Sequence, residues 1–180
     1  EQARLALERH ATSKIASVDD LFKIQTLGFR GEALPAIASV SHLELESRIE
    51  SQVDGIRLTL KGGKERAESR VVMPSGSRIT VKNLFYNTPA RLKFMRTERT
   101  EAGHVTEFIH RLALANGDCG FKLLSNNREV LNIQPGRSGR FLEQRLTAVF
   151  GNDFLGNCLE LDGGQEQASI SGWIGLPTLN

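Results

Sequence analysis

Two short blocks in the first part of the chain combine residue types that can bind an anion. Gly28 and Gly31 frame a turn that leads directly into a helix start. Glycine adopts backbone angles that other residues avoid, so the main chain can approach a phosphate closely while the first free N–H groups of the helix point outward. Shortly before this turn, Thr12, Ser13 and Lys14 offer hydroxyl and ammonium groups. Taken alone, the glycine turn is as typical of an ordinary loop-to-helix connection as of a phosphate site, and Lys14 is more typical of a solvated loop lysine.

Three blocks of sequence together resemble the MutL family of mismatch-repair proteins. They are Arg9-His10-Ala11-Thr12-Ser13-Lys14-Ile15, Thr26-Leu27-Gly28-Phe29-Arg30-Gly31-Glu32-Ala33-Leu34 and Leu84-Phe85-Tyr86-Asn87-Thr88-Pro89-Ala90-Arg91. Their spacing is that of the family, and the resemblance covers essentially the whole chain, most strongly from Leu5 to Leu114. The third block resembles MutL specifically, which argues against a gyrase-like or chaperone member of the wider GHKL ATPase superfamily.

The resemblance implies an α+β fold with two domains. The first is a two-layer α/β sandwich of the GHKL ATPase type, truncated at its N-terminus, and the second is the start of a ribosomal-S5-like domain. We expect the boundary near Asn116, so that residues 1–116 form the C-terminal part of the ATPase domain with its ATP lid. Residues 117–180 would begin the S5-like transducer domain without completing it.

The resemblance also implies an ATP site. Residues 12–14 match the ATP lid, and residues 28–34 match the superfamily's third motif, where backbone N–H groups surround the phosphates. Ser77 stands in place of the family's threonine, whose hydroxyl helps to hold the adenine end. The implied ATP-binding residues are Thr12, Ser13, Lys14, Gly28, Phe29, Arg30, Gly31, Glu32, Ala33, Leu34 and Ser77. Glu32 is expected to cap the following helix rather than to act as a general base, because a carboxylate facing the phosphates would repel them.

The catalytic part of the ATP site is expected to lie outside this chain. The family's first two motifs carry the water-activating glutamate, the asparagine that holds Mg²⁺ and the aspartate that reads adenine, and they should precede residue 1. We therefore predict no catalytic residue and no metal ligand here, and no ATP hydrolysis by this chain alone. The resemblance implies that the intact protein uses ATP with Mg²⁺, forms an ATP-dependent homodimer, and couples a MutS-type mismatch sensor to downstream repair enzymes.

Charge gives a local indication of DNA binding. The net charge is only +2, with 23 Lys and Arg against 21 Asp and Glu, so global charge makes no case for nucleic acid. Between Arg78 and Arg99, however, Glu98 is the single acid among several basic residues. The residues that we assign to largely non-specific DNA contact are Arg91, Lys93, Arg96 and Arg99. A solvated helix face is the alternative interpretation, and a nucleic-acid-binding module with a purely structural glycine turn is the second functional hypothesis.

Composition excludes several other functions. Cys119 and Cys158 are far apart and lack cysteine or histidine neighbours at metal-ligand spacing, which excludes a zinc or redox motif. No apolar run approaches the roughly 20 residues of a membrane span, and no signal peptide is visible. We therefore expect a cytoplasmic bacterial protein that acts at DNA and has no membrane partner.

Residue patterning predicts helices next to antiparallel strands. The predicted strands cover residues 42–47, 55–60, 65–72, 78–83, 121–125, 128–133, 158–161 and 168–174. Helices are predicted at 100–115 and 141–150, and Ser17 and Thr88 are the expected caps of two others. The apolar residues that should form one buried stripe on the first of these helices are Val105, Phe108, Ile109 and Leu112.

Overall fold

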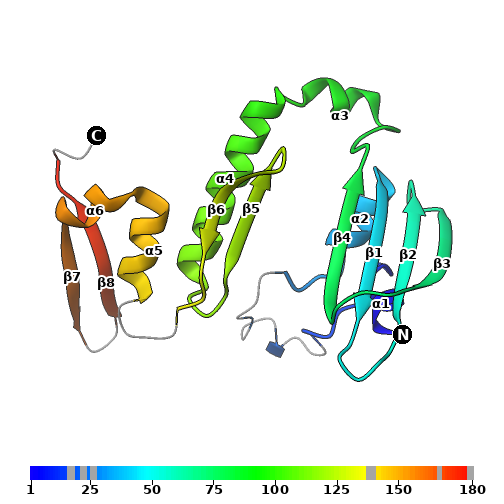
Figure 1. Cartoon of the computed structure of the whole chain (residues 1–180), viewed down its shortest axis with the longest axis horizontal. Helices are drawn as coiled ribbons and strands as arrows, with labels where there is room; N and C mark the ends of the chain where they lie inside the picture. Colours follow the sequence, from blue (N-terminus) through cyan, green and yellow to red (C-terminus); the bar gives the residue numbers. More distant parts are fainter. Residues whose placement is uncertain (16–18, 21–23, 25–27, 137–140, 166–167, 178–180) are drawn as a thin grey trace. The chain divides into compact units, whose positions relative to one another are not determined.

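The computed structural model describes residues 1–15, 19–20, 24, 28–136, 141–165 and 168–177. It divides into two compact units, Glu1–Met95 and Arg96–Asn180 (Figure 1). The helix that Ser17 is expected to cap lies outside the described residues. The predicted boundary near Asn116 separates superfamily domains rather than compact units, and it stays a prediction.

The first unit is built on a four-stranded antiparallel sheet. Its elements are α1 (Gln2–Leu5), α2 (Ala33–Ser39), β1 (His42–Arg48), β2 (Gly55–Lys61), β3 (Glu65–Val71), β4 (Gly76–Lys82) and α3 (Pro89–Phe94). The strand order is β3-β2-β1-β4, so β1 pairs with both β2 and β4. The strands predicted in this part of the chain are confirmed, with ends that shift by one or two positions.

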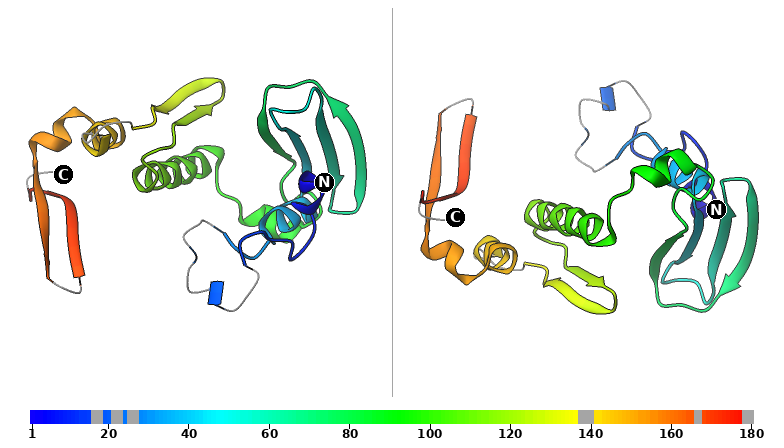
Figure 2. Two further views of the ribbon diagram at one scale, coloured as in Figure 1. Left: turned by 90° about the horizontal axis from the view of Figure 1, so that it is seen from below. Right: turned by 90° about the horizontal axis from the view of Figure 1, so that it is seen from above.

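Strand alternation gives this sheet one apolar face and one polar face. The buried apolar cluster comprises Leu7, Ala38, Leu43, Leu45, Leu58 and Leu60. The helices α1 and α2 pack on this face, and Figure 2 shows them on the same side of the sheet. The alternate residues of β1, His42, Glu44 and Glu46, point to the opposite face. One face therefore forms the core, while the other presents charged groups.

The sequence block at residues 84–91 packs against the C-terminal end of α2. The side-chain Nδ2 of Asn87 donates to the carbonyl oxygen of Ser39 at 2.9 Å. The backbone N–H of Phe85 donates to the carbonyl oxygen of Val40 at 2.7 Å. These bonds satisfy carbonyl groups that a helix end leaves unpaired, so the block fixes the far end of the helix that follows the glycine turn.

Two helix starts differ in how they are capped. Pro89 is the first residue of α3, as predicted, but the hydroxyl of Thr88 donates to the carbonyl oxygen of Phe85 at 3.4 Å and makes no capping bond. Thr88 thus occupies the predicted N-cap position, but its hydroxyl is used within the preceding turn instead of capping the helix. In α4 (Glu98–Ala115), the side chain of Thr97 does accept from the backbone N–H of Thr100, at 3.3 Å.

The second unit combines helices with two separate hairpins. After α4 come β5 (Phe121–Ser125), β6 (Arg128–Ile133), α5 (Phe141–Phe150), α6 (Asn152–Gly156), β7 (Cys158–Gln165) and β8 (Ala168–Gly175). Asn126 and Asn127, with φ of 49° and 62°, form the turn between β5 and β6. The strand β7 is longer than the predicted 158–161, because pairing with β8 continues through Gly163 and Gly164, which carry no apolar signal.

One buried arginine joins the segments of the second unit. Arg145 of α5 is only 1% exposed. Its guanidinium donates to the backbone carbonyl oxygens of Ala113, Gly117, Cys119 and Gln134. These oxygens belong to the end of α4, the loop after it and the residue after β6. Within the described part of the chain, no carboxylate pairs with Arg145, so its charge is balanced by carbonyl dipoles.

The apolar stripe of α4 is only partly buried. Ala113 is fully buried with Leu131 and Ile133, and Ile109 packs against this cluster. Val105 and Phe108, however, are 50% and 59% exposed. The prediction of one buried stripe is therefore wrong for these two residues, because the periodicity marks an apolar face without showing how far its partner extends. Neither α4 nor any other described helix is long and apolar enough to cross a membrane.

Candidate functional site

A cleft of about 980 Å³ in the first unit brings the two predicted anion-binding blocks together. Every residue of 12–14 and of 28–34 lines it. Its remaining walls come from α1, from Pro35, and from His10 and Ala11 of the loop after α1. His10 and Ala11 were not among the predicted site residues. Their position within the first of the three resembling blocks was the signal that could have found them.

The backbones of the two blocks lie close together at Gly31. This residue has φ of 62°, and a Cβ atom built on it would lie 2.3 Å from the carbonyl oxygen of Ala11 and 2.7 Å from its carbonyl carbon. These contacts are with backbone, which cannot move aside as a flexible side chain can. Glycine is therefore required at position 31 both for its conformation and for space.

Lys14 forms a second link between the same two blocks. Its Nζ donates to the carbonyl oxygen of Gly28 at 3.0 Å, while its backbone N–H donates to Oγ1 of Thr12 at 3.2 Å. Gly28 has φ of 79°, but a Cβ there would meet nothing within 4 Å. Position 28 therefore requires glycine for its backbone angle alone, and its carbonyl anchors the ammonium beside the cleft.

Glu32 occupies the N-cap position of α2, but its side chain makes no capping hydrogen bond. Its carboxylate instead pairs with Nδ1 of His10 at 3.0 Å and with Nε of Arg30 at 3.3 Å. The predicted place of Glu32 at the helix start is confirmed, but its side chain does not cap the helix, because two basic groups compete for its oxygens. The result is a third link between the blocks, through a carboxylate held by protein groups.

Ser77 lies apart from these residues. It is in β4, opposite Ser47 of β1, and the two hydroxyl oxygens are 2.8 Å apart. Ser77 does not line the cleft. The structure thus brings together the predicted ATP-binding residues of the first two blocks and leaves out Ser77, whose proposed contact with adenine stays a prediction.

The four predicted DNA-binding residues belong to both units. Arg91 and Lys93 are in α3 of the first unit, whereas Arg96 and Arg99 belong to the second. All four are exposed. The guanidinium of Arg91 lies 5.9 Å from the centre of the Phe85 ring. Each unit therefore offers basic side chains to solvent, and a common DNA surface stays a prediction.

Glu46 is a buried charged residue that the sequence analysis missed. It is 1% exposed at the centre of the sheet, and its Oε1 accepts from Nε and Nη2 of Arg57 at 2.8 and 2.6 Å. Its Oε2 accepts from Nη1 of Arg78 at 2.9 Å. The hydrogen bonds from Arg57 hold the pKa of the Glu46 carboxyl below its usual value, more strongly than burial raises it. This ion cluster joins β2, β1 and β4 and takes no part in the cleft.

The described residues contain no cluster of side chains that could bind a metal ion. No group of three or more His, Cys, Asp or Glu side chains lies close enough there to hold a metal ion. The lining of the cleft offers backbone, hydroxyl and cationic groups, which suit an anion, together with the paired carboxylate of Glu32.

No model of a known protein family matches the chain. DNA mismatch repair protein MutL of Caulobacter vibrioides is 46% identical over 189 residues, an alignment that covers 100% of this chain and 29% of that protein. The MutL protein of Chromohalobacter salexigens is 47% identical over 182 residues and is covered to 28% of its length, with 99% of this chain aligned. The chain belongs to the MutL family. It spans less than a third of the length of these MutL relatives.

Solved structures agree with MutL membership. The Aquifex aeolicus MutL ATPase domain complexed with ADP superposes with a TM-score of 0.66 and 32% identity, covering 82% of this chain and 56% of that one. Another structure, of the ATPase domain from the mismatch repair endonuclease MutL of Aquifex aeolicus, superposes with a TM-score of 0.66 and 28% sequence identity. The alignment covers 89% of this chain and 57% of that one. The predicted resemblance and the mixed α/β ATPase fold are thereby confirmed. The assignment of residues 117–180 to the start of an S5-like domain stays a prediction.

Proposed function

We propose that this chain is part of a MutL-type mismatch-repair ATPase and that its 980 Å³ cleft binds the phosphates of ATP. The single observation that carries the proposal is the close approach of Gly31 to the backbone of Ala11. It joins two separate sequence blocks into one anion-binding wall. Membership of the MutL family supports the same interpretation, since a related ATPase domain is described as complexed with ADP.

The chemistry of the cleft fits a polyphosphate. Gly28 and Gly31 let the main chain approach phosphate oxygens closely, and Thr12 and Ser13 supply hydroxyl groups. Lys14 places an ammonium at the same wall. The carboxylate of the cleft, on Glu32, is held by His10 and Arg30, which reduces its repulsion of a phosphate. Mg²⁺ bound with ATP would offset negative charge on the phosphates, and the residues of this chain hold and orient them.

We also propose that nucleotide binding in this cleft drives dimerisation and signals to other repair proteins. The helix α2 starts at the cleft and ends at the hydrogen bond from Asn87 to Ser39. A ligand that contacts both the lid residues 12–14 and the glycine turn at residues 28–31 would therefore act on residues 84–91 through the short helix α2. In this proposal, an ATP-dependent homodimer couples a MutS-type mismatch sensor to downstream repair enzymes.

Nucleotide binding is tested most directly at Gly31. In the full-length protein that carries this segment, Gly31→Ala should weaken binding of a non-hydrolysable ATP analogue at least tenfold, because the new methyl group overlaps the Ala11 backbone. The matched control is Gly103→Ala, since a Cβ at that position in α4 meets nothing within 4 Å. Titration calorimetry measures both variants. Equal affinity of Gly31→Ala and the unaltered protein would remove the proposed site.

The proposed dimer has a separate test. Light scattering after size exclusion should show the full-length protein shifting to a higher-mass species when the ATP analogue is added. Lys14→Ala should require more analogue for the same shift, because it removes the link to Gly28 and one cation at the cleft. An analogue that binds without changing the mass would leave the nucleotide site standing and exclude the dimer.

A second proposal concerns largely non-specific DNA binding by exposed basic residues. Arg91, Lys93, Arg96 and Arg99 are all accessible to a phosphate backbone. Replacing Lys93 and Arg96 with Ala should lower DNA affinity and flatten its salt dependence by about 0.9 in the log–log slope for each phosphate that the variant no longer neutralises. Fluorescence anisotropy at several salt concentrations measures this slope. An unchanged slope would contradict DNA contact at these two positions.

A further inference from the structure

The polar face of the four-stranded sheet carries side chains in rows across three strands. Directly opposite residues on paired antiparallel strands bring their side chains within contact distance. Each row takes one residue from β2, one from β1 and one from β4. The rows are Arg57–Glu46–Arg78, Thr59–Glu44–Thr80 and Lys61–His42–Lys82. We call the first the arginine row and the last the lysine row.

The two outer rows differ in their central residue. In the arginine row, the carboxylate of Glu46 receives hydrogen bonds from both flanking cations and is buried. The lysine row has two flanking cations as well, but its centre is His42. Among the ion pairs of the described side chains, none includes Lys61 or Lys82. The lysine row therefore lacks the anion that completes the arginine row.

His42 stands at the centre of the lysine row. The amide Nδ2 of Asn83 lies 3.2 Å from Nδ1 of His42. Because an amide NH₂ group only donates, Nδ1 accepts, and in the neutral ring the proton is then on Nε2. Nε2 is buried and has no hydrogen-bond partner among the described groups. An unmet buried donor is unfavourable, but a nitrogen that is closed to water does not reach a ligand in the cavity, so binding at this row depends on the flanking lysines.

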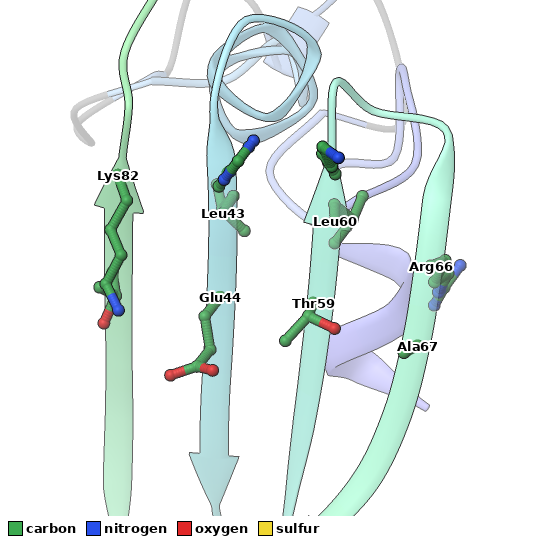
Figure 3. A pocket seen from close by; sticks show the side chains of 10 residues that line it. Leu43, Glu44, Thr59, Leu60, Arg66, Ala67 and Lys82 are labelled. Carbon is green, nitrogen blue, oxygen red and sulfur yellow. The ribbon is translucent and has the colours of Figure 1, made fainter. Parts of the chain in front are cut away.

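A cavity of about 380 Å³ lies over these residues. Lys82, Glu44 and Thr59 project into it from three neighbouring strands (Figure 3). The hydroxyls of Thr59 and Thr80 add donors beside the lysine row. One carboxylate, that of Glu44, is among the described side chains of the lining. One of its oxygens lies 3.8 Å from Nε of Arg57, and this nearby positive charge reduces the repulsion between Glu44 and an anion. The volume suits a small molecule.

We propose that the lysine row binds the phosphate group of a small ligand in this cavity. Lysine binds phosphate as a compact point charge, and two ammonium groups flanking one site can share a tetrahedral dianion. A nucleic-acid strand fits less well, because it requires cations along a track. The next cations on this face, Arg57 and Arg78, are already bonded to Glu46. The face thus offers unused charge for one phosphate group.

Chemical footprinting of the unaltered full-length protein tests the site without a mutation. Lysine acetylation is followed by peptide mass spectrometry with and without inorganic pyrophosphate. Pyrophosphate should slow acetylation of Lys61 and Lys82 but leave Lys64 unaffected, since Lys64 is exposed in the nearby turn and does not line the cavity. Lys14 reports separately on the proposed ATP cleft. Unchanged rates at Lys61 and Lys82, or equal protection at Lys64, would overturn the proposal.

Variants add a measure of affinity. Lys61→Gln and Lys82→Gln should each weaken the protective effect of pyrophosphate at the remaining lysine about tenfold, as expected for loss of one hydrogen bond to a charged group. Lys64→Gln is the matched control and should have no effect. The same footprint is repeated with a short single-stranded oligonucleotide. Protection by the oligonucleotide but not by pyrophosphate would overturn the small-ligand proposal, because the face would then be a nucleic-acid surface.

Discussion

Among the described residues, each compact unit buries one charged side chain, and the two charges are balanced in different ways. In the first unit, Glu46 pairs with Arg57 and Arg78, so charge meets charge. In the second unit, Arg145 gives its hydrogen bonds to backbone carbonyl oxygens, so charge meets dipoles. A carboxylate can be protonated and lose its partners, whereas neither arginine nor a carbonyl titrates under ordinary conditions. The difference implies that the two units respond differently to acid.

The largest effect is expected from Arg145→Met. This change leaves buried carbonyl oxygens without donors and should cost about 3 kcal/mol of the stability of the second unit. Hydrogen exchange measured by mass spectrometry should rise across residues 113–134 and stay unchanged in the sheet of the first unit. Arg111→Met is the matched control, because Arg111 pairs with Glu107 on an exposed helix surface and such pairs contribute roughly 0.5 kcal/mol. An equal rise in hydrogen exchange in the two variants would show that the hydrogen bonds of Arg145 do not hold its unit together.

Glu46→Gln should separate the acid responses of the two units. The pKa of Glu46 is lowered in the folded protein, mainly by hydrogen bonds from Arg57. Its contribution to stability is therefore present at neutral pH and is lost as the pH falls below the usual glutamate value of about 4.3 and through the lower folded value. The variant should be less stable at pH 7 and lose less on acidification. Urea unfolding of the first unit at pH 7 and at several pH values below 4 measures both effects.

A glutamate of the second unit provides the control for this pH experiment. The pKa of Glu129 is also lowered, chiefly by its hydrogen bond from Lys122, but this pair is about half exposed. Solvent screening weakens such a pair, so Glu129→Gln should change the acid response of its unit little. A strong acid response of the second unit that disappears in Glu129→Gln would contradict the proposed difference.

Helix capping gives a smaller difference between the units. Thr97→Ala removes the side-chain acceptor for the N–H of Thr100 and should destabilise α4 by about 1 kcal/mol. Thr88→Ala removes no capping bond of α3 and should stay within about 0.5 kcal/mol. Thermal unfolding of the two variants, made in the same background, measures the difference. A larger loss of stability in Thr88→Ala than in Thr97→Ala would mean that the hydrogen bond from Thr88 to Phe85 stabilises the protein more than the Thr97 cap does.

The smallest effect is expected in the hairpin turns. Asn127 has φ of 62°, so Asn127→Gly should relieve left-handed backbone strain and stabilise the second unit by about 0.5 kcal/mol. In the turn of the first unit, Gly63→Asn should instead destabilise, because a Cβ there would lie 3.2 Å from Cα of Ser39. Urea midpoints that move in the same direction for both variants would contradict this account.

Local patterns predicted the elements of the fold well, because they need only neighbouring residues. Alternation of Ile56, Leu58 and Leu60 located β2, and the paired Asn126 and Asn127 located the hairpin turn. The resemblance also predicted that residues 12–14 and 28–34 meet at one site. The structure then supplied the contact itself, between Ala11 and Gly31.

Features that depend on strand register could not be predicted in the same way. Glu46 becomes a buried ion only because Arg57 and Arg78 fall opposite it on both neighbouring strands. Glu32 occupies a cap position, yet its side chain turns to His10, a residue far away in sequence. Similarly, the exposure of Phe108 depends on how far the β5–β6 hairpin covers α4, and periodicity carries no such information.

The carbonyl clamp of Arg145 also bears on the speed of unfolding. Its partners lie between 11 and 32 positions away along the chain, so the clamp closes only after the end of α4, the following loop and the end of β6 have assembled. An interaction that forms after the folding transition state slows unfolding and leaves folding nearly unchanged. Replacing Arg145 should therefore raise the unfolding rate of the second unit strongly and change its folding rate little.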